Sequence, residues 1–490
     1  MMTTLPSSEA REERLADADI MAAVELLLLK KGVCSSLLHT QCQAGIVELV
    51  GFTDSLLSRE RAVAIAKAVR GVRGVIADIG IRTPDVPDAE LKQRAEQALQ
   101  LDPAAGDYPV QCYAHNGHVR LEGTVKTWAE SQLVLRVLTG VPGVRQVDNH
   151  LTVQDGGVKI SDEDITKQVR ELLAWDIRVK SPLVDIRTEQ GVVHLSGTVG
   201  TAAEHEQAVA TAHMAGARRV DARDLVVSYW ALDKELRRQK FAPKADEAVA
   251  EAVRDTLRLD PRVQAFEPQV HVRDGVVTLL GTVGNLRARH AAEQDAANVV
   301  GVWGVNDLLQ VRGQFPSPDG RIQQQIKDAL ASDSFLSQYN FTVNVYNGKA
   351  QLYGTVASHF ELERAQEIVA SSSGVVELVN CVELAATNEE PAEPAAAATE
   401  TDDAPVLTAS VPVPDHVLAQ RLRHRYYWSA LLHDQDIKIA VREGRVTLTG
   451  TVETWLERRR AAAEALECGA RDVNNHLHLM ASPTGSAPAA

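Results

Sequence analysis

The chain has 490 residues, of which 45% are hydrophobic, 24% charged and only 4% aromatic, and its formal net charge is −15. A chain of this length and composition is expected to form several globular domains with small cores rich in alanine and valine. The negative charge argues against nucleic-acid binding, which needs a concentrated basic surface.

The start of the chain, residues 1–19, is polar and mixed in charge. The apolar run that follows, Leu26 to Leu29, ends at Lys30 and is too short for a signal sequence or a membrane span. We therefore expect a cytoplasmic protein, with a periplasmic or envelope-associated location as the alternative. The five cysteines are scattered along the chain, which argues against a framework of disulfides.

A ten-residue sequence motif recurs six times along the chain and indicates that the chain is built from repeated domains. It consists of a turn with glycine, an alternating strand and, in five copies, Gly-Thr-Val. The copies read AGIVELVGFT from Ala44, NGHVRLEGTV from Asn116, QGVVHLSGTV from Gln190, DGVVTLLGTV from Asp274, NGKAQLYGTV from Asn347 and EGRVTLTGTV from Glu443. Where no insertion intervenes, the copies are about 72 to 74 residues apart, which is the length of one small domain.

Each copy is expected to begin with a helix followed by a β-hairpin. The apolar stripe of such a helix is clearest at Ala245, Val249, Ala252, Val253 and Leu257. After a first strand, Asn-Gly or Asp-Gly supplies the positive φ angles that a tight hairpin turn needs.

The second strand of the hairpin alternates with period two, so one pair of apolar residues should face the core in every copy. These pairs are Val47 and Leu49, Val119 and Leu121, Val193 and Leu195, Val277 and Leu279, Ala350 and Leu352, and Val446 and Leu448. A second helix, such as Trp128–Thr139, and a last strand, such as Val147–Val153, complete the unit. The two helices are expected to cover one face of a three-stranded sheet and to leave the other face open.

The predicted fold is therefore α+β, a tandem array of six small α-β-β-α-β domains. Copies one to six are expected at residues 20–82, 88–153, 161–227, 244–311, 319–384 and 414–480. A spacer, Ser228 to Lys244, follows copy three. Residues 385–413, rich in alanine, proline, glutamate and threonine, are predicted to form a flexible acidic linker that separates copy six from the rest.

The order of elements and the repeated x-G-x-V-x-L-x-G-T-V hairpin resemble the BON domain, named from bacterial osmotically inducible and nodulation proteins. The resemblance implies non-catalytic modules that bind phospholipid surfaces, with relatives in osmotic stress, cation binding, chaperoning and secretion assemblies. It covers roughly 400 of the 490 residues.

No residue constellation points to an enzyme, a cofactor or a metal. The Gly-Thr pairs lack the spacing of a phosphate-binding loop, and glycine at a strand end is typical of a close approach of two backbones. Cys34, His39 and Cys42 lack a fourth ligand for zinc, and His476 and His478 are expected to lie on a solvated strand face.

The candidate interaction surface lies on the open sheet faces and at two helix starts. The outward positions of the second strand are apolar in copy one (Ile46, Val50) and copy four (Val276, Leu280), but polar in copies two and six. Uncovered apolar groups are costly, so we expect these two faces to pack against another repeat or a partner. Scattered exposed apolar groups are the plainer alternative.

Two tryptophans, Trp128 and Trp455, stand five residues after the motif glycine of copies two and six. An aromatic ring at a helix start can enter a bilayer interface or a partner, or it can cap the domain's own core.

Together these features predict a non-catalytic, multivalent scaffold that binds a phospholipid surface, an envelope assembly or a protein partner. Two alternatives are a cation-responsive or osmotic-stress protein and a self-assembling structural repeat protein.

Overall fold

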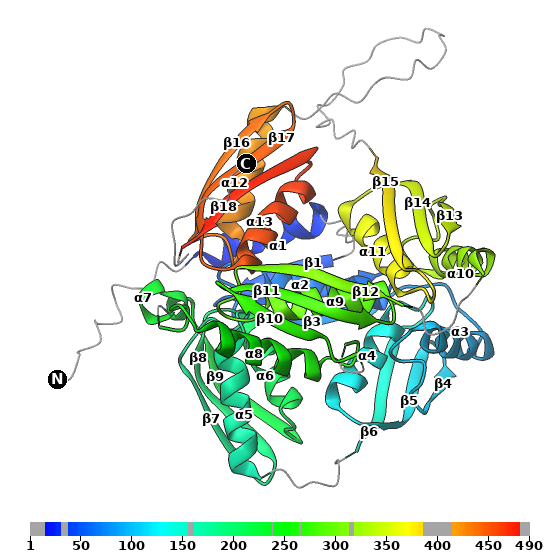
Figure 1. The fold of residues 1–490 in the computed structure, drawn as a ribbon, viewed down its shortest axis with the longest axis horizontal. Helices are drawn as coiled ribbons and strands as arrows, with labels where there is room; N and C mark the ends of the chain where they lie inside the picture. The colour runs from blue at the N-terminus through cyan, green and yellow to red at the C-terminus, as the bar shows by residue number, and fades with distance from the viewer. Residues whose placement is uncertain are drawn as a thin grey trace, which may run out of the picture.

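The computed structural model describes residues 15–30, 38–154, 161–237, 239–263, 266–312, 318–385 and 414–480. These residues form six copies of one small domain, each with a three-stranded sheet and two helices, as the sequence predicts. The copies gather into one cluster, with copy four in the middle of the view and copies two, three, five and six around it (Figure 1).

The first helix of each copy leads into a β-hairpin. These helices are α1 (Asp17–Lys30), α3 (Asp88–Leu101), α5 (Asp162–Trp175), α8 (Asp246–Leu259), α10 (Asp319–Ser332) and α12 (Asp415–Trp428). The hairpins are β1 (Leu38–Gln43) with β2 (Ile46–Thr53), β4 (Val110–His115) with β5 (His118–Val125), β7 (Val184–Glu189) with β8 (Val192–Val199), β10 (Gln269–Arg273) with β11 (Val276–Val283), β13 (Thr342–Tyr346) with β14 (Lys349–Val356), and β16 (Asp436–Arg442) with β17 (Arg445–Val452). Each hairpin is antiparallel.

The second helix returns the chain to a last strand beside the hairpin. The second helices are α2 (Leu56–Lys67), α4 (Trp128–Thr139), α6 (Ala202–Met214), α9 (Leu286–Ala297), α11 (His359–Ser371) and α13 (Trp455–Glu467). The last strands are β3 (Gly74–Ile81), β6 (Gln146–Val153), β9 (Arg219–Val227), β12 (Gly304–Val311), β15 (Glu377–Leu384) and β18 (Asp472–Leu479). Each last strand pairs in parallel with the second hairpin strand, which is therefore central in every sheet.

The predicted inward pair forms the centre of each core. All twelve of these side chains, from Val47 and Leu49 in copy one to Val446 and Leu448 in copy six, are at most 1% exposed. Each copy has a hydrophobic cluster built around that pair, and three of the six clusters also include a side chain from another copy.

An aspartate at the start of every first helix holds the hairpin turn of its own copy. In copy four, for example, Asp246 accepts hydrogen bonds from the backbone N–H groups of Asp274 and Gly275 at 2.8 and 2.9 Å. The equivalent residues are Asp17, Asp88, Asp162, Asp319 and Asp415. Both turn residues have positive φ, and charge-assisted bonds offset the strain where the first is not glycine or asparagine.

The motif glycine at the end of the central strand is a packing requirement in three copies. A Cβ atom added to Gly123, Gly197 or Gly450 would lie 2.3, 2.0 or 1.9 Å from a carbonyl oxygen just before or at the start of the neighbouring strand. The glycine therefore serves a close backbone approach, which is the structural role expected from the sequence.

Candidate functional site

Two pairs of copies, one with six and three with four, are joined by the same backbone bridge. In the first pair, Arg70 N–H donates to the Trp428 carbonyl at 2.9 Å, and Ala430 N–H donates to the Ala68 carbonyl at 3.1 Å. In the second, Val300 N–H donates to the Trp175 carbonyl at 2.8 Å. The returning bond runs from Ile177 N–H to the Asn298 carbonyl at 3.0 Å. Each bridge thus pairs the loop after a first helix with the loop after another copy's second helix.

A tryptophan at the end of the first helix accompanies each bridge. Trp428 is 8% exposed and belongs to the hydrophobic core of copy one, and Trp175 packs against the core of copy four. Sequence reasoning missed both residues. The available signal was that, among the six first helices, only α5 and α12 end in tryptophan.

Copy six is also fixed to copy three by a buried ion pair. The ammonium of Lys180 contacts the carboxylate of Glu457, and the two side chains are 3% and 0% exposed. Burial alone would lower the pKa of Lys180, but the Glu457 carboxylate outweighs it and raises that pKa. The sequence placed copy six beyond a linker, yet the described residues hold it firmly against copies one and three.

The spacer after copy three contributes further contacts to this region. It contains a short 3-10 helix, η3 (Tyr229–Leu232), and one turn of helix, α7 (Lys234–Arg237). The buried guanidinium of Arg237 pairs with Asp434 and Glu453 of copy six. The Lys240 ammonium donates to the Leu173 carbonyl at 2.6 Å and so completes the end of α5 in copy three. The spacer therefore connects copy three to copy six.

A histidine lies where the spacer, copy one and copy six meet. His433 contacts the hydroxyl of Tyr229, and the guanidinium of Arg70 lies 4.9 Å from the Tyr229 ring centroid. Burial lowers the pKa of His433 to about 4, and the neighbouring positive charge of Arg70 acts in the same direction. The imidazole is therefore neutral in the folded protein at neutral pH.

Copies two and five also meet at the loop after a first helix and the loop after a second helix, but the described residues form no backbone bridge there. The Ser334 hydroxyl donates to the Gly140 carbonyl at a long 3.4 Å, and α10 ends in serine instead of tryptophan. Leucines at the start of the second helices of copies one and four extend into the cores of copies two and five. Leu56 of copy one joins the core of copy two, and Leu286 of copy four joins the core of copy five.

The open faces of copies one and four carry the apolar residues that the sequence singled out. Ile46 is 44% exposed, whereas Val50, Val276 and Leu280 are half-buried. Two residues of the last strands extend these faces: Ile76, beside Glu48, is 55% exposed, and Leu308, beside Leu280, is 58% exposed. Sequence reasoning missed this pair because it considered only the second strand.

Ile46 also borders a groove of about 550 Å³ between copies one and three. Val75 of copy one and Val209 and Leu225 of copy three provide apolar walls. At the rim, Lys67 pairs with Glu206 at 2.9 Å, so the two copies are tied together across the groove.

The two tryptophans expected at an interaction surface have different surroundings. Trp128 stacks on His213 of copy three, with ring centroids 5.1 Å apart and an angle of 9° between the planes. Trp455 is half-buried, and the guanidinium of Arg458 on the same helix lies 5.0 Å from its ring centroid. The structure thus brings Trp128 into a contact between copies and leaves Trp455 within copy six.

The metal-type residues noted in the sequence are dispersed. Cys34 lies outside the described residues, and Cys42 is half-buried, with its thiol contacting Asp17. Burial, helped by that carboxylate, raises the pKa of the Cys42 thiol to about 11. His476 and His478 are exposed on β18. Within the described ranges, no three His, Cys, Asp or Glu side chains are grouped to hold a metal, and no helix has the length and apolar content to cross a membrane.

Comparison with known proteins identifies the repeated unit. The family model described as BON domain matches residues 16–83, 87–155, 161–228, 245–313, 318–386 and 414–481. Osmotically-inducible protein Y of Escherichia coli (strain K12) is 37% identical over 95 residues, which cover 18% of this chain and 47% of that protein. Outer membrane lipoprotein DolP of Haemophilus influenzae is 30% identical over 142 residues, covering 28% of this chain and 72% of that protein. This chain thus matches about half the length of the first relative.

A solved structure is also similar over part of the chain. CdsD, a structural protein of the type III secretion system of Chlamydia trachomatis, has 14% sequence identity and a TM-score of 0.12, covering 46% of this chain and all of that one.

Proposed function

Because the chain belongs to the BON-domain family, with six family domains between residues 16 and 481, we propose that it is a non-catalytic scaffold that binds through its open sheet faces. The names of its two relatives associate those proteins with osmotic induction and with the outer membrane, and neither name denotes an enzyme. These names favour a role in envelope stress and the envelope-associated location over the cytoplasmic one.

The observation that carries the proposal is the apolar character of two open faces. Ile46 and Ile76 of copy one and Leu308 of copy four are large apolar side chains, each at least 44% exposed on the side of the sheet opposite the domain's own inward pair. By contrast, the corresponding face of copy two carries an exposed Arg120–Glu122 ion pair. Contiguous exposed apolar groups are typical of surfaces that bind a partner or a membrane.

The junctions between copies support binding by more than one face at once. The backbone bridges and the Lys180–Glu457 pair fix copies one, three, four and six relative to one another. Two binding faces held at a fixed separation engage one extended partner or surface with high effective concentration. A phospholipid surface is the extended partner that we favour.

Liposome co-sedimentation tests this function. We expect the protein to sediment with vesicles, and we expect Ile76→Glu combined with Leu308→Glu to abolish sedimentation because a carboxylate cannot enter the apolar interface. The matched control is Thr447→Glu, which places the same charge on the outer face of copy six.

Absence of sedimentation at every content of anionic lipid would remove the lipid version of the proposal. Size-exclusion chromatography with light scattering would then separate the remaining versions. A dimer that dissociates in the Ile76→Glu, Leu308→Glu variant would assign the same faces to self-association.

A further inference from the structure

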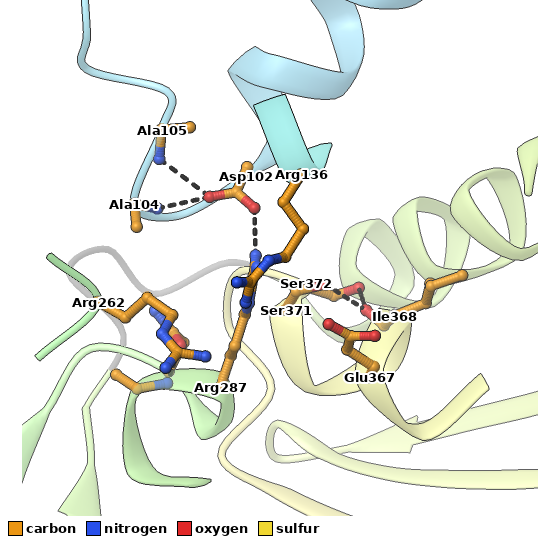
Figure 2. Close-up of polar contacts among 12 residues, drawn as sticks. Asp102, Ala104, Ala105, Arg136, Arg262, Arg287, Glu367, Ile368, Ser371 and Ser372 are labelled. Carbon is orange, nitrogen blue, oxygen red and sulfur yellow. Dashed lines mark hydrogen bonds and ion pairs between the residues drawn. The ribbon is translucent and has the colours of Figure 1, made fainter. Parts of the chain in front are cut away.

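Three arginines converge where copies two, four and five meet. Arg136 extends from α4 of copy two, Arg287 from α9 of copy four, and Arg262 from the loop after α8 of copy four (Figure 2). Arg262 and Arg287 are largely buried, with side chains 21% and 12% exposed, whereas Arg136 is exposed to solvent. We call these three residues the arginine junction.

Two of the three guanidinium groups have a carboxylate of their own. Arg262 pairs with Asp260 through Nη2 and Nε, and Arg287 pairs with Asp102 across the boundary between copies. Asp102 is itself held in place, because its other oxygen accepts the backbone N–H groups of Ala104 and Ala105 at 3.0 and 2.9 Å (Figure 2).

The third guanidinium, that of Arg136, has no hydrogen bond or ion pair among the described residues. Glu367 of copy five is close enough for its carboxylate to raise the pKa of Arg136. That carboxylate already accepts a hydrogen bond from Arg364 at 3.0 Å. The buried Nε of Arg287 also lacks a partner within the described part of the chain. The junction therefore offers unused N–H donors on two copies.

The charges around Arg136 are mixed. Desolvation at the junction and then the neighbouring charges of Arg262 and Arg287 lower the pKa of Arg136, while the carboxylates of Glu367 and Asp260 act in the opposite direction. The hydroxyl groups of Ser371 and Ser372 nearby donate to the Ile368 carbonyl.

We propose that the arginine junction binds a compact phosphate oxyanion, as inorganic phosphate or a phosphate monoester. Guanidinium groups form paired hydrogen bonds with phosphate oxygens, and a tetrahedral anion can accept from donors that approach from different directions. The ligand would contact Arg136 of copy two and Arg287 of copy four together. Binding would thus reinforce the boundary between those copies, independently of the scaffold function proposed above.

Thermal unfolding of the full chain tests this site. At constant ionic strength, replacing chloride with 10 mM inorganic phosphate should raise Tm by a few degrees, because a ligand that binds only the folded state stabilises it. In Arg136→Gln the phosphate-dependent rise should vanish. The same variant should melt at or above the wild-type temperature in chloride, since it loses an unpaired charge next to two others.

A matched variant separates specific binding from the general stabilising effect of phosphate salts. Arg187→Gln removes an arginine that is 77% exposed and lies on the hairpin of copy three. It should keep the full phosphate response. An equal Tm rise in wild type and Arg136→Gln, or no rise in wild type up to 50 mM phosphate, would overturn the proposal.

Further arms distinguish the source of the phosphate group. Soluble glycerol 3-phosphate and vesicles containing phosphatidic acid present the same phosphate monoester. Whichever of the two raises the Tm of wild type but not of Arg136→Gln is a source that reaches the site.

Phosphorus NMR of inorganic phosphate gives a readout that does not depend on unfolding. Line broadening by wild type but not by Arg136→Gln is expected.

Discussion

The pairing of copy one with six and the pairing of copy two with five use similar surfaces to different effect. In the first, two backbone hydrogen bonds form and Trp428 enters the partner copy's core. In the second, the Ser334 hydroxyl donates a long hydrogen bond across the boundary, and Ser332 stands at the helix end. The comparison shows that the two bridged pairs are those in which a first helix ends in tryptophan, and this side chain is therefore the one to test.

Removing Trp428 should have the largest effect on the pairing of copies one and six. Trp428→Ala should lower the free energy of unfolding by about 3–5 kcal/mol, because it deletes a buried aromatic side chain and leaves a cavity in copy one. Urea denaturation monitored by far-ultraviolet circular dichroism measures the change, because this signal does not rely on tryptophan fluorescence. Trp455→Ala, at a half-buried position in the same copy, is the control and should cost much less.

The buried ion pair is the next test, because it fixes copy six from the other side. Lys180→Met should destabilise the protein by about 3 kcal/mol, since it leaves the Glu457 carboxylate buried without its partner. Adding Glu457→Gln should restore most of that loss, because it removes the buried charge while its amide oxygen can still accept the backbone N–H groups of Glu453 and Thr454. If the double variant were as unstable as the single one, the charge of Glu457 would not be the cause.

Acid should weaken the one-to-six junction selectively. The folded protein lowers the pKa of His433 to about 4, below the unfolded value near 6.5, so the unfolded state binds the proton more readily. Stability contributed by neutral His433 is therefore complete above pH 6.5 and is lost as the pH falls towards 4, by about 2 kcal/mol. His433→Gln should flatten this part of the pH–stability profile, and an unchanged slope would contradict the assignment.

The smallest expected effect comes from giving copy five the missing tryptophan. Ser332→Trp should strengthen the two-to-five pairing by roughly 1 kcal/mol if the ring packs as Trp175 and Trp428 do. Ser332→Ala controls for loss of the hydroxyl. A lower Tm in Ser332→Trp would mean that copy two has no space for the ring.

The fold of one copy was predictable because its determinants are local. Alternation placed Val119 and Leu121 in the core, and the glycine in each two-residue turn marked the hairpins. The turn-holding aspartates were also readable in principle, since they recur 28 or 29 residues before the turn glycine. Sequence reasoning missed these aspartates because it considered only the ten-residue hairpin motif.

Contacts between copies were not predictable in the same way. Lys180 and Glu457 are 277 residues apart, and neither stands in a pattern that names the other. Trp128 was expected at a partner-binding or core-capping position, but its neighbour His213 comes from a different copy. The arginine junction likewise depends on how three copies meet, which no single repeat specifies.

Pairing of the first copy with the last has a consequence for synthesis. The 360 positions from Val69 to Ser429 take a ribosome about 20–70 s to translate. During that time copy one has emerged without the tryptophan that completes its core. Copy one therefore completes its core only after copy six has been synthesised, and until then the apolar side chains that Trp428 contacts are left uncovered.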